Sequence, residues 1–347
     1  MNSYIVLHGV GDLRLEKGPV QEIEPHEVLV RMSWVGICGS DVSLAYKGKL
    51  ADYELEPPLG VGHEASGVVA KCGSDVKNLK PGDRVALEPG NPCGSCQFCR
   101  GGHYNTCETS CFHSSPVPNP GCLSHYYKHR ADLCHKLPDT VSLEEGALIE
   151  PFAVAIHACR RSGVSMGTSV LICGAGPLGL LGLVTAKAMG ASNILVTDIK
   201  AKRLEVARQM GAHHTLLVDG SEPRAFAQRV KQTMGCMPEV SLECSGVESA
   251  FATAIYATRM CGVVMVMGLP TKDVTLPIVN AAIREVDIRG VFRYVNCYPI
   301  AIEMISKGLV NLKALITHSF KFGDFQKAFE ICRDGADGVV KCLISCE

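Results

Sequence analysis

The sequence predicts an α/β protein of two domains, in which a β-rich domain is followed by a doubly wound parallel sheet. The length of 347 residues exceeds the roughly 100 to 200 residues usual for one domain. Short strand-like runs separated by glycine and proline fill the chain up to about residue 150. From about residue 155, strand-like and helical patterns alternate, which is typical of a parallel sheet with helices on both faces.

The first domain is expected to span residues 1–152 and to consist mainly of strands. Apolar runs at 27–32 and 65–70 have the length of short strands, and helical periodicity is scarce around them. After about residue 289 the later alternation stops, and a helix-like segment at 299–306 and a strand-like tail follow. The residues alone leave open whether 290–347 is a third unit or returns to the first domain.

The second domain is expected to span residues 153–289, with each strand followed by a helix. In one of these helices, apolar residues recur at every third position from Ala201 to Met210, and Gly211 stands just beyond as its end. The expected strands are 170–173, 194–198, 215–218, 240–243 and 263–267, and the expected helices are 178–188, 201–210, 223–233 and 247–257.

A glycine-rich turn lies between the first strand and first helix of this second domain. Gly174, Gly176 and Gly179 have the G-x-G-x-x-G spacing that allows a tight turn, a close approach of the backbone to a pyrophosphate, and close helix packing. The helix N-terminus would add N–H groups and a partial positive charge for phosphates. Asp198 follows at the end of the next strand, about 20 residues on, where a carboxylate binds the adenosine ribose hydroxyls. The pattern predicts a Rossmann dinucleotide site that favours NAD.

Residues 162–186 contain no charged side chain and are long enough to span a bilayer, so a membrane helix is the alternative for this stretch. Such a helix would be interrupted by Pro177 and by Gly174, Gly176, Gly179 and Gly182, whereas each of these has a place in a strand, turn and helix. We therefore favour the nucleotide turn.

The composition indicates a small-molecule partner. Charged residues make up 20% of the chain and the formal net charge is −1, without a basic block or an acidic tail, which argues against nucleic acid or a membrane surface as the partner. The N-terminus lacks the pattern of a secretory signal, so a cytoplasmic protein is expected. Its 18 cysteines are then expected to be reduced, as metal ligands or small core residues.

Cys93, Cys96, Cys99 and Cys107 form a compact pattern typical of a structural zinc site. Two residues separate each of the first three, and seven residues precede the fourth. Four thiolates on short loops can close a tetrahedron around Zn²⁺ and leave no open coordination position. Cys111 is an alternative to Cys107 as the fourth ligand.

A second set of zinc-ligand types is spread along the first domain. Cys38, His63, Glu64 and Glu150 offer one thiolate, one imidazole and two carboxylates, which suits a catalytic Zn²⁺ held by three protein ligands and a water. Their separation in the sequence leaves open whether they meet. A turn histidine and a surface glutamate are the simpler alternatives for His63 and Glu64.

These motifs occur in the same order in zinc-dependent medium-chain dehydrogenases, and the chain most closely resembles their sorbitol (polyol) dehydrogenase branch. The resemblance covers nearly the whole chain. The shared segments are 36–41, 60–67, 93–107, 143–151, 157–161, 174–179, 281–288 and 291–294.

The resemblance implies a GroES-like catalytic domain, rejoined by 290–347, beside the Rossmann domain. It implies a catalytic zinc on Cys38, His63 and Glu64, with Glu150 as a further ligand or a partner of the zinc water. Ser40 would belong to a proton relay, and Arg293 and Tyr294 would contact the substrate. The implied cofactor-binding residues are Gly174, Gly176, Pro177, Leu178, Gly179, Asp198, Arg203, Met267, Gly268, Leu269, Val291, Phe292 and Arg293.

The expected function is NAD-dependent oxidation of a sugar alcohol of the sorbitol or xylitol type to a ketose, by a homotetramer. Branch members commonly carry His-Tyr where this chain has Ser43 and Leu44, and the tyrosine contacts substrate. Another secondary alcohol is therefore the alternative substrate. A nucleotide-binding protein without catalytic activity is the alternative from another class.

Overall fold

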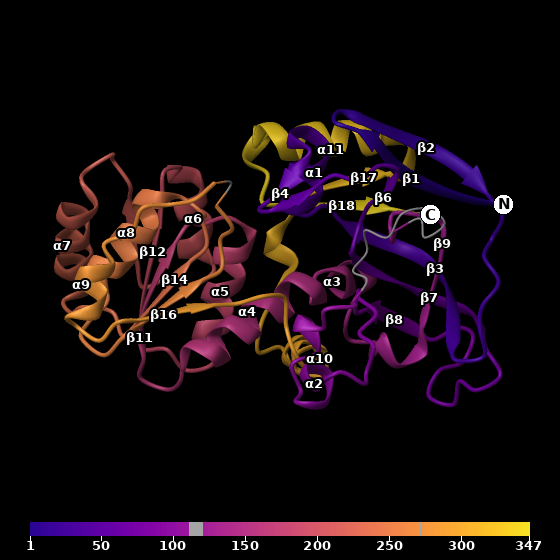
Figure 1. The fold of residues 1–347 in the computed structure, drawn as a ribbon, viewed down its shortest axis with the longest axis horizontal. Helices are drawn as coiled ribbons and strands as arrows, with labels where there is room; N and C mark the ends of the chain where they lie inside the picture. The colour runs from indigo at the N-terminus through magenta and orange to yellow at the C-terminus, as the bar shows by residue number, and fades with distance from the viewer. Residues whose placement is uncertain (111–120, 271) are drawn as a thin grey trace. The chain divides into compact units, whose positions relative to one another are not determined.

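The computed structural model describes residues 1–110, 121–270 and 272–347, which form two compact units. One unit combines Met1–Glu150 with Tyr298–Glu347, and the other is Pro151–Cys297. In Figure 1 the C-terminal segment, in yellow, accordingly lies among the indigo strands of the N-terminal segment. The resemblance stated above implied that the returning segment starts at 290. In the structure, residues up to Cys297 remain with the second unit, and the Val291 backbone N–H still donates to Val266.

The first unit is built on a seven-stranded sheet. Its inner strands β3 (Glu27–Gly36) and β7 (Glu64–Cys72) are antiparallel, and their register places Gly36 opposite Glu64. β18 (Lys341–Ser345) lies beside β3, so a segment late in the chain contributes to the centre of this sheet. The order is β10 (Cys134–Lys136), β8 (Arg84–Leu87), β7 (Glu64–Cys72), β3 (Glu27–Gly36), β18 (Lys341–Ser345) and β17 (Ile316–Lys321), with β9 (Tyr126–Arg130) also paired to β3.

Shorter elements complete the first unit around an apolar core. The core includes Ile5, Val28, Leu44, Phe329 and Ile344, all at most 4% exposed, from segments far apart in the sequence. Removing such side chains from water is the main stabilising contribution of this unit. The other strands are β1 (Asn2–Gly9), β2 (Asp12–Gly18), β4 (Lys49–Leu50), β5 (Tyr53–Glu54) and β6 (Leu59–Gly60), and the helices are α1 (Gly39–Lys47), α2 (Gln97–Arg100), α3 (Leu143–Ala147), α10 (Tyr298–Ser306) and α11 (Phe325–Asp334).

The second unit contains a six-stranded parallel sheet of the Rossmann order. The strands run β13 (His214–Leu217), β12 (Asn193–Asp198), β11 (Ser169–Cys173), β14 (Val240–Glu243), β15 (Val263–Val266) and β16 (Asp287–Gly290). This order reverses direction between β11 and β14, and a ligand crevice lies at such a switch point in doubly wound sheets. The fold class expected from the sequence is confirmed.

The helices of this unit are α4 (Ile149–Ser162), α5 (Pro177–Ala188), α6 (Ala201–Gln209), α7 (Pro223–Met234), α8 (Glu248–Ala257) and α9 (Ile278–Ala282). The alternative of a membrane span at 162–186 is wrong, because this stretch contains β11 and most of α5. Among the described residues, no helix combines the length and apolar character needed to cross a bilayer.

Candidate active site

Cys38, His63 and Glu64 converge in the first unit. One potential ligand atom from each lies within 4.8 Å of the other two, and His63 and Glu64 are buried. Tetrahedral zinc bonds of about 2.0 to 2.3 Å require ligand atoms within roughly 4 Å of each other, so a small adjustment suffices. A thiolate, an imidazole and a carboxylate are also the donor types that zinc prefers. The residues fit a zinc ion.

The backbone explains why Cys38 and Glu64 lie close together. Cys38 stands at the N-cap of α1, immediately after β3, and Glu64 begins β7 opposite Gly36. A Cβ atom at position 36 would lie 2.1 Å from Glu64 Oε2, so only glycine leaves room for this carboxylate. The pairing of β3 with β7 therefore holds the carboxylate beside the thiol.

The carboxylate of Asp41 lies beside the imidazole ring of His63. The Asp41 carboxylate is buried, accepts the Cys38 backbone N–H at 3.1 Å, and lies with Oδ1 3.3 Å from His63 Nδ1. Burial opposes both charges, but each stabilises the other: the pKa of Asp41 is lowered and the pKa of His63 is raised well above its usual value, with Cys38 adding to the latter. A histidine bonded through one ring nitrogen offers the other to a metal.

Lys341 pairs with Glu64 inside the unit. Its Nζ lies 2.5 Å from Glu64 Oε2 and donates to Oε1 at 2.6 Å and to the Ile37 carbonyl at 3.1 Å. Burial disfavours the ammonium, but Glu64 and Cys38 outweigh it, so the pKa of Lys341 is raised. Lys341 is thus a buried, charged neighbour of two candidate ligands.

The other two residues expected near the metal, Glu150 and Ser40, belong to the same unit. Glu150 is 5% exposed, at the start of α4, but its carboxylate is not one of the three clustered ligand atoms. Ser40 is half-buried in the first turn of α1. On the same helix, Ser43 donates to the Lys49 carbonyl at 2.8 Å, and Leu44 packs in the apolar core.

Cys93, Cys96, Cys99 and Cys107 form a second cluster, with their sulfur atoms all within 4.8 Å of one another. Cys93 Sγ and Cys99 Sγ are 3.9 Å apart, close to the edge of about 3.8 Å of a tetrahedron with 2.3 Å Zn–S bonds. The Ser95 and Cys96 N–H groups lower the pKa of Cys93 to about 5, which favours the thiolate. These residues also fit zinc. Cys111, the alternative ligand, lies outside the described residues.

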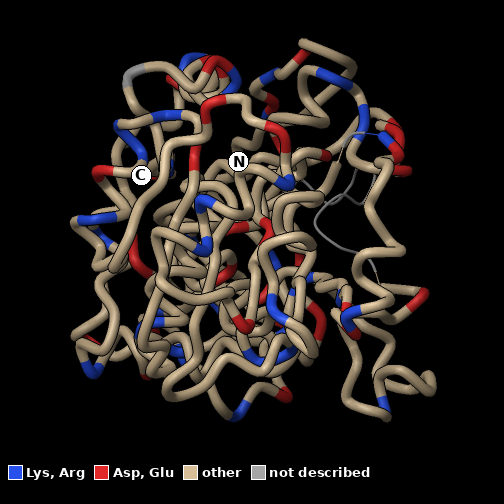
Figure 2. Tube along the Cα trace, turned by 90° about the vertical axis from the view of Figure 1, so that its left-hand side faces the viewer, with Lys and Arg blue, Asp and Glu red and all other residues tan. Residues whose placement is uncertain are grey.

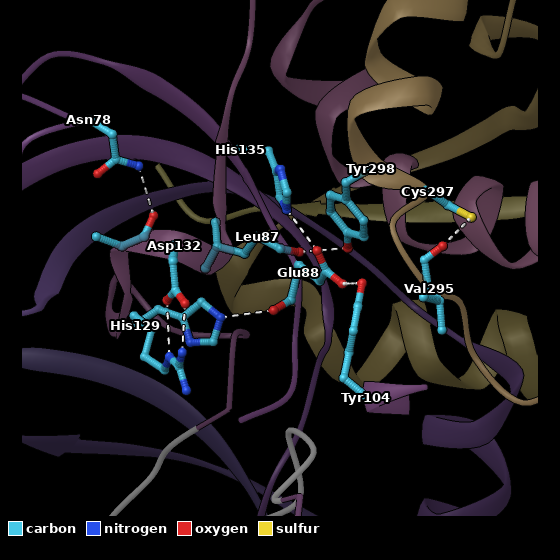
Figure 3. Close-up of polar contacts among 12 residues, drawn as sticks. Asn78, Leu87, Glu88, Tyr104, His129, Asp132, His135, Val295, Cys297 and Tyr298 are labelled. Carbon is cyan, nitrogen blue, oxygen red and sulfur yellow. Dashed lines mark hydrogen bonds and ion pairs between the residues drawn. The ribbon is translucent and has the colours of Figure 1, made fainter. Parts of the chain in front are cut away.

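Tyr104, between the third and fourth cysteines, fastens this loop to the sheet. Its hydroxyl donates to Glu88 Oε1 at 2.6 Å, and His135 Nε2 of β10 bonds Glu88 Oε2 at 2.7 Å (Figure 3). The Glu88 carbonyl accepts from His129 Nε2 of β9 at 2.9 Å. The buried Glu88 carboxylate therefore joins the four-cysteine loop to β10, while the Glu88 backbone carbonyl contacts β9.

The predicted nucleotide residues gather at the carboxyl edge of the parallel sheet in the second unit. The glycine turn follows β11, and a Cβ at Gly179 would lie 1.8 Å from the Gly174 carbonyl oxygen, which explains that glycine. Asp198 ends β12, and its carboxylate accepts the N–H groups of Ala175 and Lys200, each at 2.8 Å. The other predicted nucleotide-binding residues of this part are Gly176 and Pro177 at the start of α5, Leu178 in its first turn, and Arg203 on α6.

The segments that follow β15 and β16 begin at the same carboxyl edge of the parallel sheet. Met267 and Gly268 follow β15, and both backbone N–H groups donate to the Glu243 carbonyl at 2.8 Å. Leu269 and Phe292 are exposed, Val291 is half-buried, Arg293 lies over the Phe292 ring at 4.5 Å, and Tyr294 is 2% exposed. Apolar and aromatic side chains here suit a nicotinamide ring.

Comparison with known proteins agrees with this arrangement. The alcohol dehydrogenase GroES-like domain matches residues 24–139, and the zinc-binding dehydrogenase domain matches residues 177–307. Over 346 residues, 100% of the chain, the identity is 49% to Homo sapiens sorbitol dehydrogenase and 48% to that of Gallus gallus, covering 96% and 97% of those proteins. An Escherichia coli oxidoreductase/dehydrogenase of unknown specificity superposes with a TM-score of 0.92 at 35% identity, covering 99% of each chain.

The chain is a zinc-binding dehydrogenase of the sorbitol dehydrogenase branch. In this dehydrogenase, sequence reasoning missed Asp41 and Lys341 as neighbours of the candidate ligands. Asp41 stands three residues after Cys38, one helical turn away, so its proximity could have been inferred. Lys341 is 277 residues from Glu64, and no local pattern marks it.

Proposed function

We propose that this dehydrogenase uses zinc and NAD to oxidise a sugar alcohol of the sorbitol or xylitol type to a ketose. The similarity to sorbitol dehydrogenases over the full chain is the observation that carries the proposal. The convergence of Cys38, His63 and Glu64 supports it, because an inactive descendant would not need a set of ligand types so close together.

Cys38, His63 and Glu64 would hold the catalytic zinc, and the four-cysteine loop would hold a structural one. When bound, the catalytic zinc supplies Lewis acidity that lowers the pKa of the substrate hydroxyl, and NAD supplies the hydride acceptor. Glu150, buried at the start of α4, is our candidate to accept the hydroxyl proton or to hold a water there. Ser40 would pass the proton on toward solvent.

Asp198 supports NAD rather than NADP. Its carboxylate ends β12, where it would bind the free ribose hydroxyls and repel a 2′-phosphate. The glycine turn and the N-terminus of α5 would hold the pyrophosphate. Val291, Phe292 and the loop of Met267 to Leu269 would line the nicotinamide, and Arg293 and Tyr294 would contact the substrate.

Leu44 favours a second candidate substrate class. The branch tyrosine expected at this position is replaced by a leucine that packs in the core, so one polar substrate contact is lost. A less hydroxylated secondary alcohol would tolerate this loss better than a hexitol, because it leaves fewer hydroxyl groups unpaired.

A panel of polyols and simple secondary alcohols tests the proposal, with NAD and NADP and with and without a chelator. We expect chelator-sensitive formation of NADH with sorbitol or xylitol. A preference for an alcohol without neighbouring hydroxyls would select the second class. Bound zinc and NAD without turnover of any alcohol would contradict both.

We further propose a homotetramer in the cytoplasm. The side chains of Ile278, Val279 and Ile283 on or beside α9 are 53%, 76% and 73% exposed, and β16 next to them is an edge strand. An apolar surface beside an unpaired strand edge suits contact with a second copy of the chain. The grouping of Cys93, Cys96, Cys99 and Cys107 as candidate metal ligands suits a compartment that keeps thiols reduced.

A further inference from the structure

Lys341 is placed where it can act on the metal through one of its ligands. Its side chain is 4% exposed and that of Glu64 is 1% exposed, so water screens their interaction little. The ammonium reaches both oxygens of the carboxylate and also the carbonyl of Ile37, the residue before Cys38. The bond to Ile37 fixes the ammonium on the cysteine side of the carboxylate.

The position of Glu64 beside Lys341 is enforced by the sheet. Lys341 begins β18, which pairs with β3, and β3 pairs with β7, where Glu64 stands opposite Gly36. Because the backbone at Gly36 closes the space behind Glu64, the carboxylate has little freedom to leave the ammonium. A bound metal would then share the carboxylate with Lys341, since each carboxylate oxygen has two lone pairs.

Charge counting shows what the ammonium would contribute. The thiolate of Cys38 and the carboxylate of Glu64 carry two negative charges, and a neutral His63 adds none, so these three ligands cancel the charge of Zn²⁺. A neutral centre polarises an alcohol oxygen less than a positively charged centre does. Lys341 restores one positive charge beside the ligand set and withdraws electron density from Glu64.

We propose that Lys341 is a positioning residue that keeps the catalytic metal electron-poor by sharing the Glu64 carboxylate with it. The metal is then held less tightly and polarises the substrate oxygen more strongly. This inference rests on the proposed zinc site. A simple counterion role makes the opposite prediction for metal affinity, because loss of Lys341 would disorder Glu64 and weaken zinc binding.

The rate at which zinc leaves the protein separates the two roles. Zinc release to an excess of a chromophoric chelator is followed in the wild type and in Lys341→Met, and the phase that is missing from Cys38→Ala identifies the catalytic site. We expect this phase to be at least about tenfold slower in Lys341→Met, because a positive charge near the metal is removed. We expect kcat to fall while the NAD dissociation constant stays unchanged.

Two variants make the result interpretable. Lys136→Met removes an exposed lysine paired with Asp83 at 2.7 Å and should leave zinc release unchanged. Lys341→Gln removes the charge but keeps N–H donors for Glu64 and Ile37, and it replaces Lys341→Met if that variant does not fold. Release as fast as in the wild type, or faster, would overturn the role of Lys341. The absence of any phase that depends on Cys38 would instead contradict the proposed zinc site.

Discussion

Asp41 and Lys341 act on the candidate ligands from opposite sides. Asp41 stabilises a positive charge on His63 and raises its pKa, whereas Lys341 stabilises the negative charge on Glu64. The first interaction competes with metal binding at low pH, because a metal needs the neutral imidazole. The second gives the buried Glu64 carboxylate a cationic partner inside the unit.

Asp41→Asn should change both the strength and the pH dependence of zinc binding. In the apoprotein the raised pKa of His63 means that zinc must displace a proton, so zinc affinity should rise as pH increases through that pKa. Loss of the Asp41 charge lowers this pKa and moves the rise to lower pH. At a pH where His63 is neutral in both proteins, the variant should bind zinc about 10 to 100 times more weakly. Competition titrations at several pH values measure both effects, and an identical pH dependence would exclude Asp41 as the cause.

Asp198→Ala should relax the preference for NAD. The substitution removes the carboxylate that would repel a 2′-phosphate, while Lys200 and Arg203 remain nearby. The ratio of kcat/KM for NAD to that for NADP should fall by at least about tenfold. Glu205→Ala, on the same helix as Arg203, is the matched control. An unchanged ratio would show that Asp198 does not select the cofactor.

At the scale of elements, the Rossmann strands were predictable and several other elements were not. The strand 240–243 was predicted at its observed bounds because it is a buried apolar run with clear ends. β16 was missed since Asp287 and Arg289 make it polar, and the edge of the sheet leaves much of it exposed. Helices α1 and α3 were missed in a region that contains mostly strands.

Separation along the sequence decides which residues of the site could be predicted from local patterns. The four cysteines lie within 15 residues, so spacing alone indicated a common metal. Cys38, His63 and Glu64 come together only through the pairing of β3 with β7, and Lys341 only through β18. Such long-range strand pairing leaves no local signal, and the resemblance to a family supplied the expectation instead.

Tyr104→Phe tests the attachment of the four-cysteine loop to the sheet. It removes the hydroxyl that donates to the buried Glu88 carboxylate. A hydrogen bond to a charged group contributes about 1.5 to 3 kcal/mol, so the free energy of unfolding should fall by that amount. Tyr53→Phe, at an exposed tyrosine, is the control and should change little. Denaturant titrations measure both, and equal stability of the two variants would mean that Glu88 does not hold the loop.

At the scale of the whole molecule, Figure 2 shows acidic and basic residues interspersed along the trace. The formal net charge is −1. Such mixing suits a protein whose ligands are small molecules rather than nucleic acid. It also leaves apolar contact, rather than opposite charge, as the main source of self-association.

Val279→Lys should weaken the proposed self-association. Val279 is 76% exposed within the apolar surface of α9, where a charge would have to be desolvated on contact. Light scattering after size-exclusion chromatography should give a smaller assembly than for the wild type. Leu309→Lys alters an exposed apolar residue of the other unit and serves as control. The same mass for both variants would place the interface elsewhere.

The most direct test of the proposed function is oxidation of sorbitol and xylitol by NAD in the wild type, Cys38→Ala and Cys261→Ala. Cys261 is an exposed cysteine of the second unit, outside both cysteine-containing clusters. We predict that Cys38→Ala still binds NAD but loses one zinc per chain and at least about 10³-fold of kcat, whereas Cys261→Ala matches the wild type. Wild-type turnover by Cys38→Ala would contradict a catalytic zinc at this cysteine.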